Sequence, residues 1–267
     1  MSSGRRQRQQ AMRQRVVAAQ AEQRRAARRQ RLLLVGGAVL AVAVLVAFVA
    51  LIIVHATSGG SSSTSSTVRA TTASDFGKTP CPAGDGRNLR TVKFTSAPAS
   101  CIDPNGHYVA KFVTTAGDFT VTLDAARAPV TVNNFVVLAE YHYYDGTTFH
   151  RVIPDYVVQG GDATGSPPGT GNPGYTIADE FPKSLSDFTT GSVAMANTGA
   201  AHSGASQFFI WVGPHALPSP EYSLFGQVSS GMATVTKIAQ GGSRSGSPAD
   251  PVTITSVTIG QAGITSR

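Results

Sequence analysis

Residues 149–162 read FHRVIPDYVVQGGD, and this stretch decides how the chain is interpreted. It places the guanidinium group of Arg151 two residues after an aromatic ring and eight residues before the amide of Gln159, with mostly apolar residues between them and a Gly-Gly pair directly after the glutamine. A second stretch, residues 195–209, adds Asn197, Gln207 and Phe209. Together these residues predict a mostly apolar groove with one fixed cation and several amide groups. Such a groove suits a neutral ligand whose geometry changes more than its charge.

Six short motifs follow one another along the chain. They are APVTVNNF at 128–135, YDGTTFHR at 144–151, QGGD at 159–162, MAN at 195–197, GASQFF at 204–209 and LFG at 224–226. In this order they resemble the motifs of the cyclophilins, the prolyl-isomerase family, over residues 105–260. The resemblance implies an all-β fold with capping helices, namely an eight-stranded antiparallel closed barrel with two α-helices.

The hydrophobic pattern also predicts a β-rich domain. Residues 108–115 and 119–123 read as a hairpin around Gly117, and residues 129–139 read as a helix with proline at its first position. Further strands are expected at 148–153, 156–159, 192–196, 207–212, 224–228 and 252–259, and a second helix at 231–239. Many short strands with two helices fit a barrel. Composition alone would not distinguish a barrel from a sandwich.

The N-terminal 31 residues carry most of the positive charge. They contain ten arginines and one acidic residue, which gives +9, so the remaining residues of the +7 chain sum to −2. A basic tail could bind nucleic acid. The uncharged run that follows it favours a cytoplasmic tail instead, and no nucleic-acid partner is expected.

Residues 32–54 contain no charged side chain over 23 positions. About 20 apolar residues suffice to cross a bilayer as a helix, and arginines on one flank predict that this flank stays in the cytoplasm. We therefore expect a single-pass anchor in a bacterial cell membrane, with the rest of the chain outside the cytoplasm. A cleaved secretory signal is the alternative, although its apolar core normally has only about 7–15 residues. Residues 55–74 predict a flexible Ser/Thr-rich linker.

Residues 75–103 predict an irregular lead-in to the domain at 104–262. This lead-in holds Cys81 and Cys101, the two cysteines of the chain. In an oxidising compartment they could form a disulfide, and the alternative is a pair of free thiols. Because there is no Cys-x-x-Cys motif, neither a zinc site nor a thioredoxin-like site is supported, and no metal or cofactor is expected.

Arg151 and Gln159 are the predicted catalytic residues. An Xaa-Pro bond isomerises over a barrier of about 18–20 kcal/mol, and its proline nitrogen regains a lone pair when the bond is twisted. A donor aimed at that nitrogen stabilises the transition state selectively. We expect Arg151 to be that donor and Gln159 to orient it or to hold a substrate carbonyl. The alternative for Arg151 is an ordinary surface salt bridge.

The family resemblance implies a wider set of substrate-binding residues: Phe149, His150, Tyr156, Val157, Ala196, Asn197, Thr198, Gln207, Phe209, Leu217 and Tyr222. Core packing is the alternative role for Val157 and Phe209, and a turn-forming role is the alternative for Asn197. Leu217 stands where many family members have tryptophan. The resemblance therefore implies weak binding of cyclosporin.

The expected function is a peptidyl-prolyl cis/trans isomerase, with a monomeric catalytic domain that acts on Xaa-Pro segments of unfolded or exported proteins. A non-catalytic module that binds proline-containing peptides is one alternative. A chaperone that uses its surface rather than a pocket is another.

Overall fold

A computed structural model describes residues 75–84, 86–214 and 221–261. The predicted tail, anchor and linker, residues 1–74, lie outside these ranges. Within the described ranges, no helix is long and apolar enough to span a membrane.

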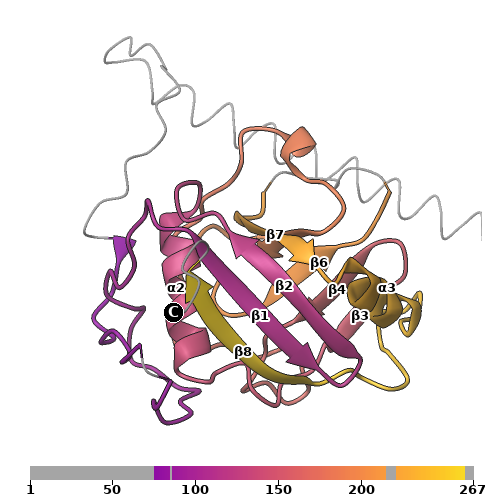
Figure 1. The fold of residues 1–267 in the computed structure, drawn as a ribbon, viewed down its shortest axis with the longest axis horizontal. Helices are drawn as coiled ribbons and strands as arrows, with labels where there is room; N and C mark the ends of the chain where they lie inside the picture. Colours follow the sequence, from indigo (N-terminus) through magenta and orange to yellow (C-terminus); the bar gives the residue numbers. More distant parts are fainter. Residues whose placement is uncertain (1–74, 85, 215–220, 262–267) are drawn as a thin grey trace, which may run out of the picture. The chain divides into compact units, whose positions relative to one another are not determined.

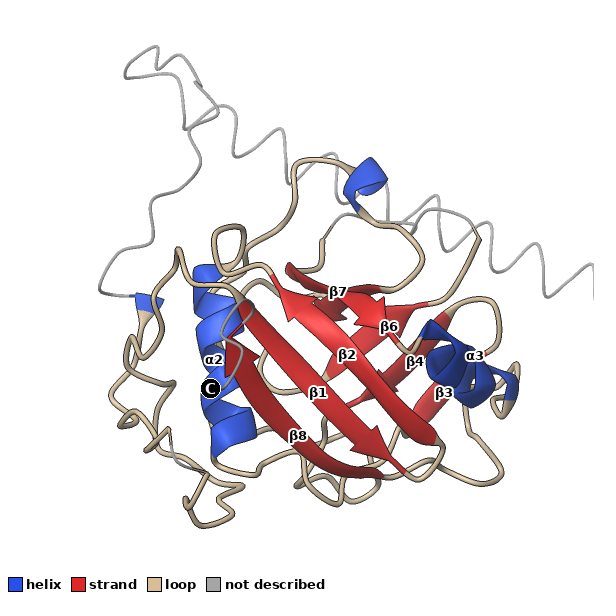
Figure 2. Ribbon diagram, in the orientation of Figure 1, coloured by secondary structure: helices blue, strands red, loops and turns tan. Residues whose placement is uncertain are grey.

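Eight strands form one antiparallel sheet in the order β3-β4-β6-β5-β7-β2-β1-β8, which curls around the core (Figure 1 and Figure 2). The strands are β1 Tyr108–Thr114, β2 Gly117–Leu123, β3 Arg151–Ile153, β4 Val157–Gly160, β5 Ser192–Met195, β6 Phe208–Trp211, β7 Leu224–Ser230 and β8 Ile254–Gln261. The helices are α2, Pro129–Glu140, and α3, Met232–Gln240, with a short 3₁₀ helix, η2, at Leu185–Asp187. All eight strands and both helices expected from the sequence are confirmed, with shifted ends.

The barrel is closed less completely than expected. Among the described residues, the edge strands β3 and β8 share no ladder. They are joined through an isolated bridge between Thr148 and Thr253, beside which the Phe149 N–H donates to the Val252 carbonyl at 3.0 Å. The predicted strand at 148–153 is shortened to the three residues of β3, and the ends of the eight-stranded curl are joined by a few backbone hydrogen bonds rather than by a ladder.

The core fills the inside of this curl with aromatic rings. Alternate residues of β1 and β2 point inward, and the rings of Phe112 and Phe119 stack at 4.5 Å between centroids. Phe135 of α2 and Phe208 of β6 meet edge to face at 5.8 Å. Each large apolar side chain buried in this way stabilises the fold by about 1.5–3 kcal/mol.

Helix α2 is capped by a side chain from a distant loop. Ala128, at its N-cap position, provides no side-chain cap, but the Glu180 carboxylate accepts the N–H groups of Val130 at 3.0 Å and Thr131 at 2.8 Å. Burial raises the pKa of Glu180 above its ordinary value, although these two hydrogen bonds act to lower it. The negative charge also meets the positive end of the helix dipole. The loop that carries Glu180 is thereby fixed to α2.

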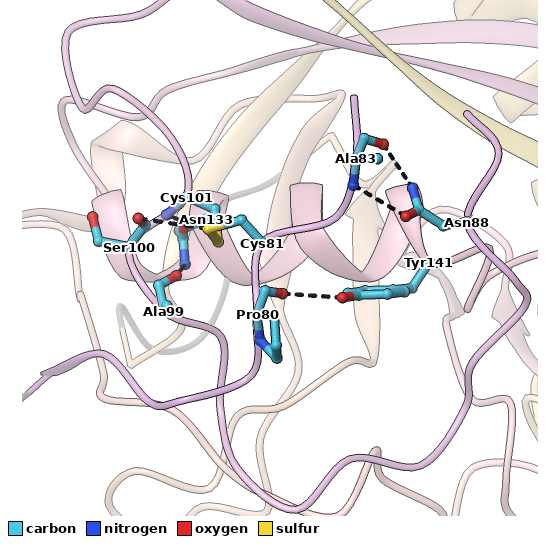
Figure 3. Close-up of a disulfide and its surroundings, with 9 residues drawn as sticks. All are labelled: Pro80, Cys81, Ala83, Asn88, Ala99, Ser100, Cys101, Asn133 and Tyr141. Atoms are coloured by element: carbon cyan, nitrogen blue, oxygen red, sulfur yellow. Dashed lines mark hydrogen bonds between the residues drawn. A yellow bond between two sulfur atoms is a disulfide. The ribbon is translucent and has the colours of Figure 1, made fainter. Parts of the chain in front are cut away.

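The lead-in, residues 75–103, runs beside α2 and is called the strap from here on (Figure 1). The predicted disulfide between Cys81 and Cys101 is confirmed (Figure 3). Next to it, Asn133 of α2 accepts the Cys101 N–H at 2.7 Å and donates to the Ala99 carbonyl at 2.8 Å. The Tyr141 hydroxyl donates to the Pro80 carbonyl at 3.1 Å. The strap is thus tied both to itself and to the helix.

Asp162 organises the loop that follows β4. One carboxylate oxygen accepts the N–H groups of Thr164 and Gly165 at 2.9 and 2.7 Å, and the other accepts those of Gly169 and Gly171 at 2.7 and 2.9 Å. Burial alone would raise the pKa of Asp162, but the four hydrogen bonds outweigh it and hold the pKa below its ordinary value. Residues 163–174, called the Asp162 loop, are folded around this one charge.

Replacing Asp162 by asparagine is expected to lower the free energy of unfolding by about 2–3 kcal/mol, because an amide cannot accept from both sides as a carboxylate does. Since the folded pKa lies below the unfolded one, this contribution is complete above the unfolded value of 3.8 and is lost as the pH falls through the folded value. Urea unfolding of wild type and Asp162→Asn between pH 2 and 7 measures both effects.

The matched control is Asp118→Asn, whose partly exposed carboxylate pairs with Lys111 at the surface. It should change stability by less than about 0.5–1 kcal/mol. Equal stabilities of the two variants at pH 7 would contradict the role assigned to Asp162.

The double substitution Cys81→Ser/Cys101→Ser is expected to lower the free energy of unfolding by roughly 3 kcal/mol, because the disulfide closes a loop with a sequence separation of 20. Adding dithiothreitol to wild type should produce a similar loss in chemical denaturation. The double variant should not respond to the reductant, and identical stabilities of the two proteins under oxidising conditions would show that the disulfide contributes nothing.

Candidate active site

The register of the sheet places Arg151 in one row with Gln159 and an apolar patch. Arg151 of β3 pairs with Gln159 of β4, and Gln159 pairs with Phe209 of β6. Phe209 pairs with Ala194 of β5, which pairs with Leu224 of β7. Residues paired across antiparallel strands lie on the same face. A cation, an amide and three apolar side chains therefore stand side by side on the face opposite the core.

The apolar part of this row belongs to a second hydrophobic cluster, separate from the core. Its buried members are Val157, Phe188, Ala194, Phe209, Trp211 and Leu224. Partly buried side chains cover its rim: Ile153, Tyr156, Leu185, Ala196 and Tyr222. Tyr222 meets Phe209 edge to face at 5.1 Å, and Tyr156 meets Trp211 in the same way at 5.0 Å. This cluster offers a partly open apolar surface to a small ring.

A chain of hydrogen bonds fixes the polar part of the row. Arg151 donates through Nη1 to Gln159 Oε1 at 3.1 Å, and Gln159 donates through Nε2 to Gln207 Oε1 at 3.3 Å. Gln207 in turn donates to the carbonyls of Gly169 and Gly171, both at 3.0 Å. Each amide is thereby held in one orientation. The expectation that Gln159 orients Arg151 fits this arrangement.

The described neighbours of the Arg151 guanidinium are an amide and an aromatic ring. Over the described ranges, no carboxylate lies within salt-bridge distance of it. Its carbon lies 5.8 Å from the centre of the Tyr156 ring, a cation–π geometry. The side chain is half-buried and borders the apolar cluster. The described part of the chain thus gives no support to the salt-bridge alternative for Arg151.

A hollow of about 200 Å³ lies beside the hydrogen-bonded side chains of Gln159 and Gln207. Gln159 and Gln207 line it on one side, and residues 169–172 of the Asp162 loop line another. The remaining lining residues are Ala196, Asn197, Thr198, Ser203, Ala205 and Ser206. Most of its lining side chains are polar, in contrast to those of the cluster around Phe209. The two together form a site with an apolar half and a polar half.

Most of the residues predicted for the site are brought together. Tyr156, Val157, Phe209 and Tyr222 belong to the apolar half. Thr198, Asn197 and Gln207 line the polar half, and Ala196 contributes to both. Leu217 lies outside the described residues.

The structure bears on the predicted roles of Phe149 and Asn197. Phe149 is fully buried in the core, where it contacts Phe119 and Phe208, so its side chain cannot reach a ligand. The Asn197 side chain serves its own turn, because it donates to the Glu221 carbonyl at 2.8 Å and accepts the Gly199 N–H at 3.0 Å. The bonds that the turn-forming alternative requires are therefore present, and a substrate contact at Asn197 stays a prediction.

His150 lies behind the polar half rather than in it. A side chain at Gly169, whose φ is +96°, would come within about 3.0 Å of the imidazole. Neither ring nitrogen has a hydrogen-bond partner among the described residues. Burial lowers the pKa of His150 below its ordinary value, so the ring is neutral at neutral pH. His150 supports the Asp162 loop by packing.

Sequence reasoning missed Trp211 and the residues that cover the cluster from the loop around η2. Trp211 was detectable, because it stands two residues after Phe209 on the same predicted strand and so shares its face. Phe188 and Leu185 come from a segment without periodicity. No comparable signal marked them.

The chemistry available to this site is that of a fixed donor beside an apolar surface. Within the described part of the chain, no three histidine, cysteine, aspartate or glutamate side chains are grouped to hold a metal ion. The permanent charge of Arg151 needs no proton transfer to act. The arrangement suits stabilisation of a developing lone pair on a neutral apolar ligand.

Comparison with known proteins agrees with this geometry. Residues 109–259 match the family of cyclophilin type peptidyl-prolyl cis-trans isomerases. The peptidyl-prolyl cis-trans isomerase cypE of Dictyostelium discoideum is 39% identical over 150 residues, which cover 54% of this chain and 93% of that protein. The probable peptidyl-prolyl cis-trans isomerase B of Mycobacterium tuberculosis is 36% identical over 197 residues, covering 67% of this chain and 62% of that protein.

Solved structures give the same result. The crystal structure of a cyclophilin type isomerase of Cryptosporidium parvum superposes with a TM-score of 0.53 at 28% identity, covering 58% of this chain and 98% of that one. A second crystal structure of the same protein, in the presence of the dipeptide Ala-Pro, has a TM-score of 0.53 at 29% identity. This chain belongs to the cyclophilin-type peptidyl-prolyl cis-trans isomerases.

Proposed function

We propose that the chain is a membrane-anchored isomerase that assists the folding of exported proteins, and that Arg151 supplies the decisive hydrogen bond. The observation that carries the catalytic part is the row Arg151–Gln159–Phe209. These three residues lie on neighbouring strands, with Gln159 between the cation and the aromatic ring. The proline ring of a substrate rests on the cluster around Phe209. Its nitrogen then faces the guanidinium.

The mechanism depends on how the substrate changes during rotation. In the planar amide the proline nitrogen has no free lone pair, so Arg151 gains little from it. At the twisted state the nitrogen becomes pyramidal and accepts a hydrogen bond. Because Gln159 and Gln207 already hold the guanidinium in place, little reorganisation is needed at that moment. The bond therefore stabilises the transition state more than either planar isomer.

One hydrogen bond does not account for the whole expected acceleration. A charge-assisted bond contributes about 1.5–3 kcal/mol, which corresponds to roughly 10- to 150-fold in rate. The apolar half of the site supplies a second contribution, since it removes water from the planar amide. The polar half holds the residues next to the proline and fixes the position of the bond.

The proposed location outside the cytoplasm rests on two observations. Residues 32–54 form an uncharged run of 23 residues with arginines before it. The strap holds a disulfide, and disulfides persist mainly in oxidising compartments. Clients would then be exported chains, which present Xaa-Pro bonds before they fold.

Arg151→Ala is expected to reduce kcat/KM by about 10- to 150-fold, because it removes the donor to the proline nitrogen. Arg151→Lys should recover only part of the loss, since an ammonium group keeps the charge but not the planar geometry that bonds Gln159. NMR exchange spectroscopy on a capped Ala-Pro peptide measures the isomerisation rate directly.

Lys111→Met serves as the control, because it removes a cation from an exposed surface pair. Its rate should equal that of wild type. An Arg151→Ala variant with the full rate would rule out the mechanism. A wild-type protein that binds the peptide without accelerating exchange would favour a non-catalytic binding module.

The proposed membrane orientation predicts that protease added to intact spheroplasts cuts the linker at residues 55–74 and releases the isomerase domain, while the N-terminal tail stays protected. Tags at the two ends of the full-length chain report each fragment by immunoblot. Detergent lysis, as the control, should expose both tags. A protected C-terminal tag in intact spheroplasts would refute the proposed orientation.

A further inference from the structure

The strap contacts the loop that walls the polar hollow. It precedes residues 109–259, which match the family, yet Phe94 donates its N–H to the Pro173 carbonyl at 2.7 Å. Lys93 donates through Nζ to the Asn172 carbonyl at 3.2 Å. Asn172 itself lines the hollow. Two adjacent strap residues therefore hold the end of the Asp162 loop by its backbone.

The contact is close enough to require a glycine. Gly174 has a φ of +109°, a conformation that favours glycine, and a Cβ at this position would overlap the carbonyl oxygen of Phe94. The two backbones thus pack directly on each other. A movement of the strap at Phe94 must move the loop as well.

A second series of contacts connects the strap to Ala205, another residue that lines the hollow. The Phe94 ring meets Tyr175 edge to face at 6.2 Å, and the Tyr175 hydroxyl donates to Asn134 Oδ1 at 2.7 Å. Asn134 of α2 then donates through Nδ2 to the Ala205 carbonyl at 2.6 Å. Ala205 is one of the lining residues. Phe94 is therefore connected both to the Asp162 loop and to Ala205, which line different parts of the hollow.

The Asp162 loop also bonds to the row of amides that ends at Arg151. The carbonyls of Gly169 and Gly171 accept from Gln207, which bonds Gln159. The Cys81–Cys101 disulfide brackets the strap segment that contains Lys93 and Phe94.

We infer that Lys93 and Phe94 are positioning residues that set the shape of the polar hollow and thereby the recognition of substrate residues flanking the proline. The inference rests on the proposed function, because the hollow must receive part of the peptide. The substrates that depend on it are extended peptides with polar backbone or side chains beyond the Xaa-Pro unit. A bare Xaa-Pro dipeptide needs only Arg151 and the apolar half.

The experiment compares two substrates on the full-length chain in detergent: a capped Ala-Pro dipeptide and a capped hexapeptide with Ala-Pro at its centre. Titration followed by NMR gives Kd, and exchange spectroscopy at saturation gives the catalysed rate. Wild type should bind the hexapeptide more tightly. Phe94→Ala should weaken hexapeptide binding by about 5-fold and Lys93→Met by about 3-fold, with the saturated rate and the dipeptide Kd changed by less than about 1.5-fold.

Leu89→Ala is the matched control, because Leu89 belongs to the same strap and is 85% exposed. It should leave both substrates unchanged. Lys93→Arg, which keeps a donor at the same position, should restore hexapeptide binding. If circular dichroism shows that Phe94→Ala does not fold, the pair Lys93→Met and Lys93→Arg decides the question.

Equal losses on both peptides would show that the strap acts only on general stability, and unchanged hexapeptide binding would show that it does not shape the hollow. Either result overturns the inference, as does a wild type that binds both peptides equally. A wild type that isomerises neither peptide would overturn the proposed function instead.

Discussion

The site depends on a continuous set of hydrogen bonds that begins at the Asp162 carboxylate and ends at the Arg151 guanidinium. Asp162 accepts the N–H groups of Gly169 and Gly171, and the carbonyls of the same two residues accept from Gln207. Gln207 then orients Gln159, which accepts from Arg151. Chains of this kind polarise their members and fix one arrangement when every bond is made. A half-buried anion at one end thus holds a cation at the other, with no direct ion pair between them.

The strands β5 and β6 at the centre of this row are covered on both faces. In β5 and β6 every residue is buried, since Val193, Phe208 and Ile210 face the core while Ala194 and Phe209 face the second cluster. Such strands read as continuous apolar runs rather than alternating ones. For this reason the sequence pattern could not distinguish a barrel from a sandwich. It also could not separate core packing from ligand contact at Phe209.

Local signals identified the elements, whereas the site required the register. Pro129 at the first position of α2 and Gly117 at the hairpin turn act within a few residues, so both elements were predictable. The row from Arg151 to Leu224 joins five strands, and a shift of one residue in any ladder would move a side chain to the other face. Only the motif resemblance, not periodicity, could bring these residues together. Phe149 shows the limit of that resemblance, because membership of a motif did not say which face its ring takes.

The half-buried guanidinium of Arg151 costs the folded protein stability, and its unused hydrogen-bond donors give a reason for that cost. A guanidinium group has five N–H donors, and of the described residues only Gln159 accepts a hydrogen bond from it. Its positive charge is half-buried beside an apolar cluster, and no carboxylate of residues 75–84, 86–214 or 221–261 lies within salt-bridge distance, which costs stability. A salt bridge would relieve that cost but would also occupy the donors. The chain of amides instead fixes the group and leaves donors unused by the described residues, so under the proposed mechanism a twisted imide nitrogen would return the stabilisation that the folded protein forgoes.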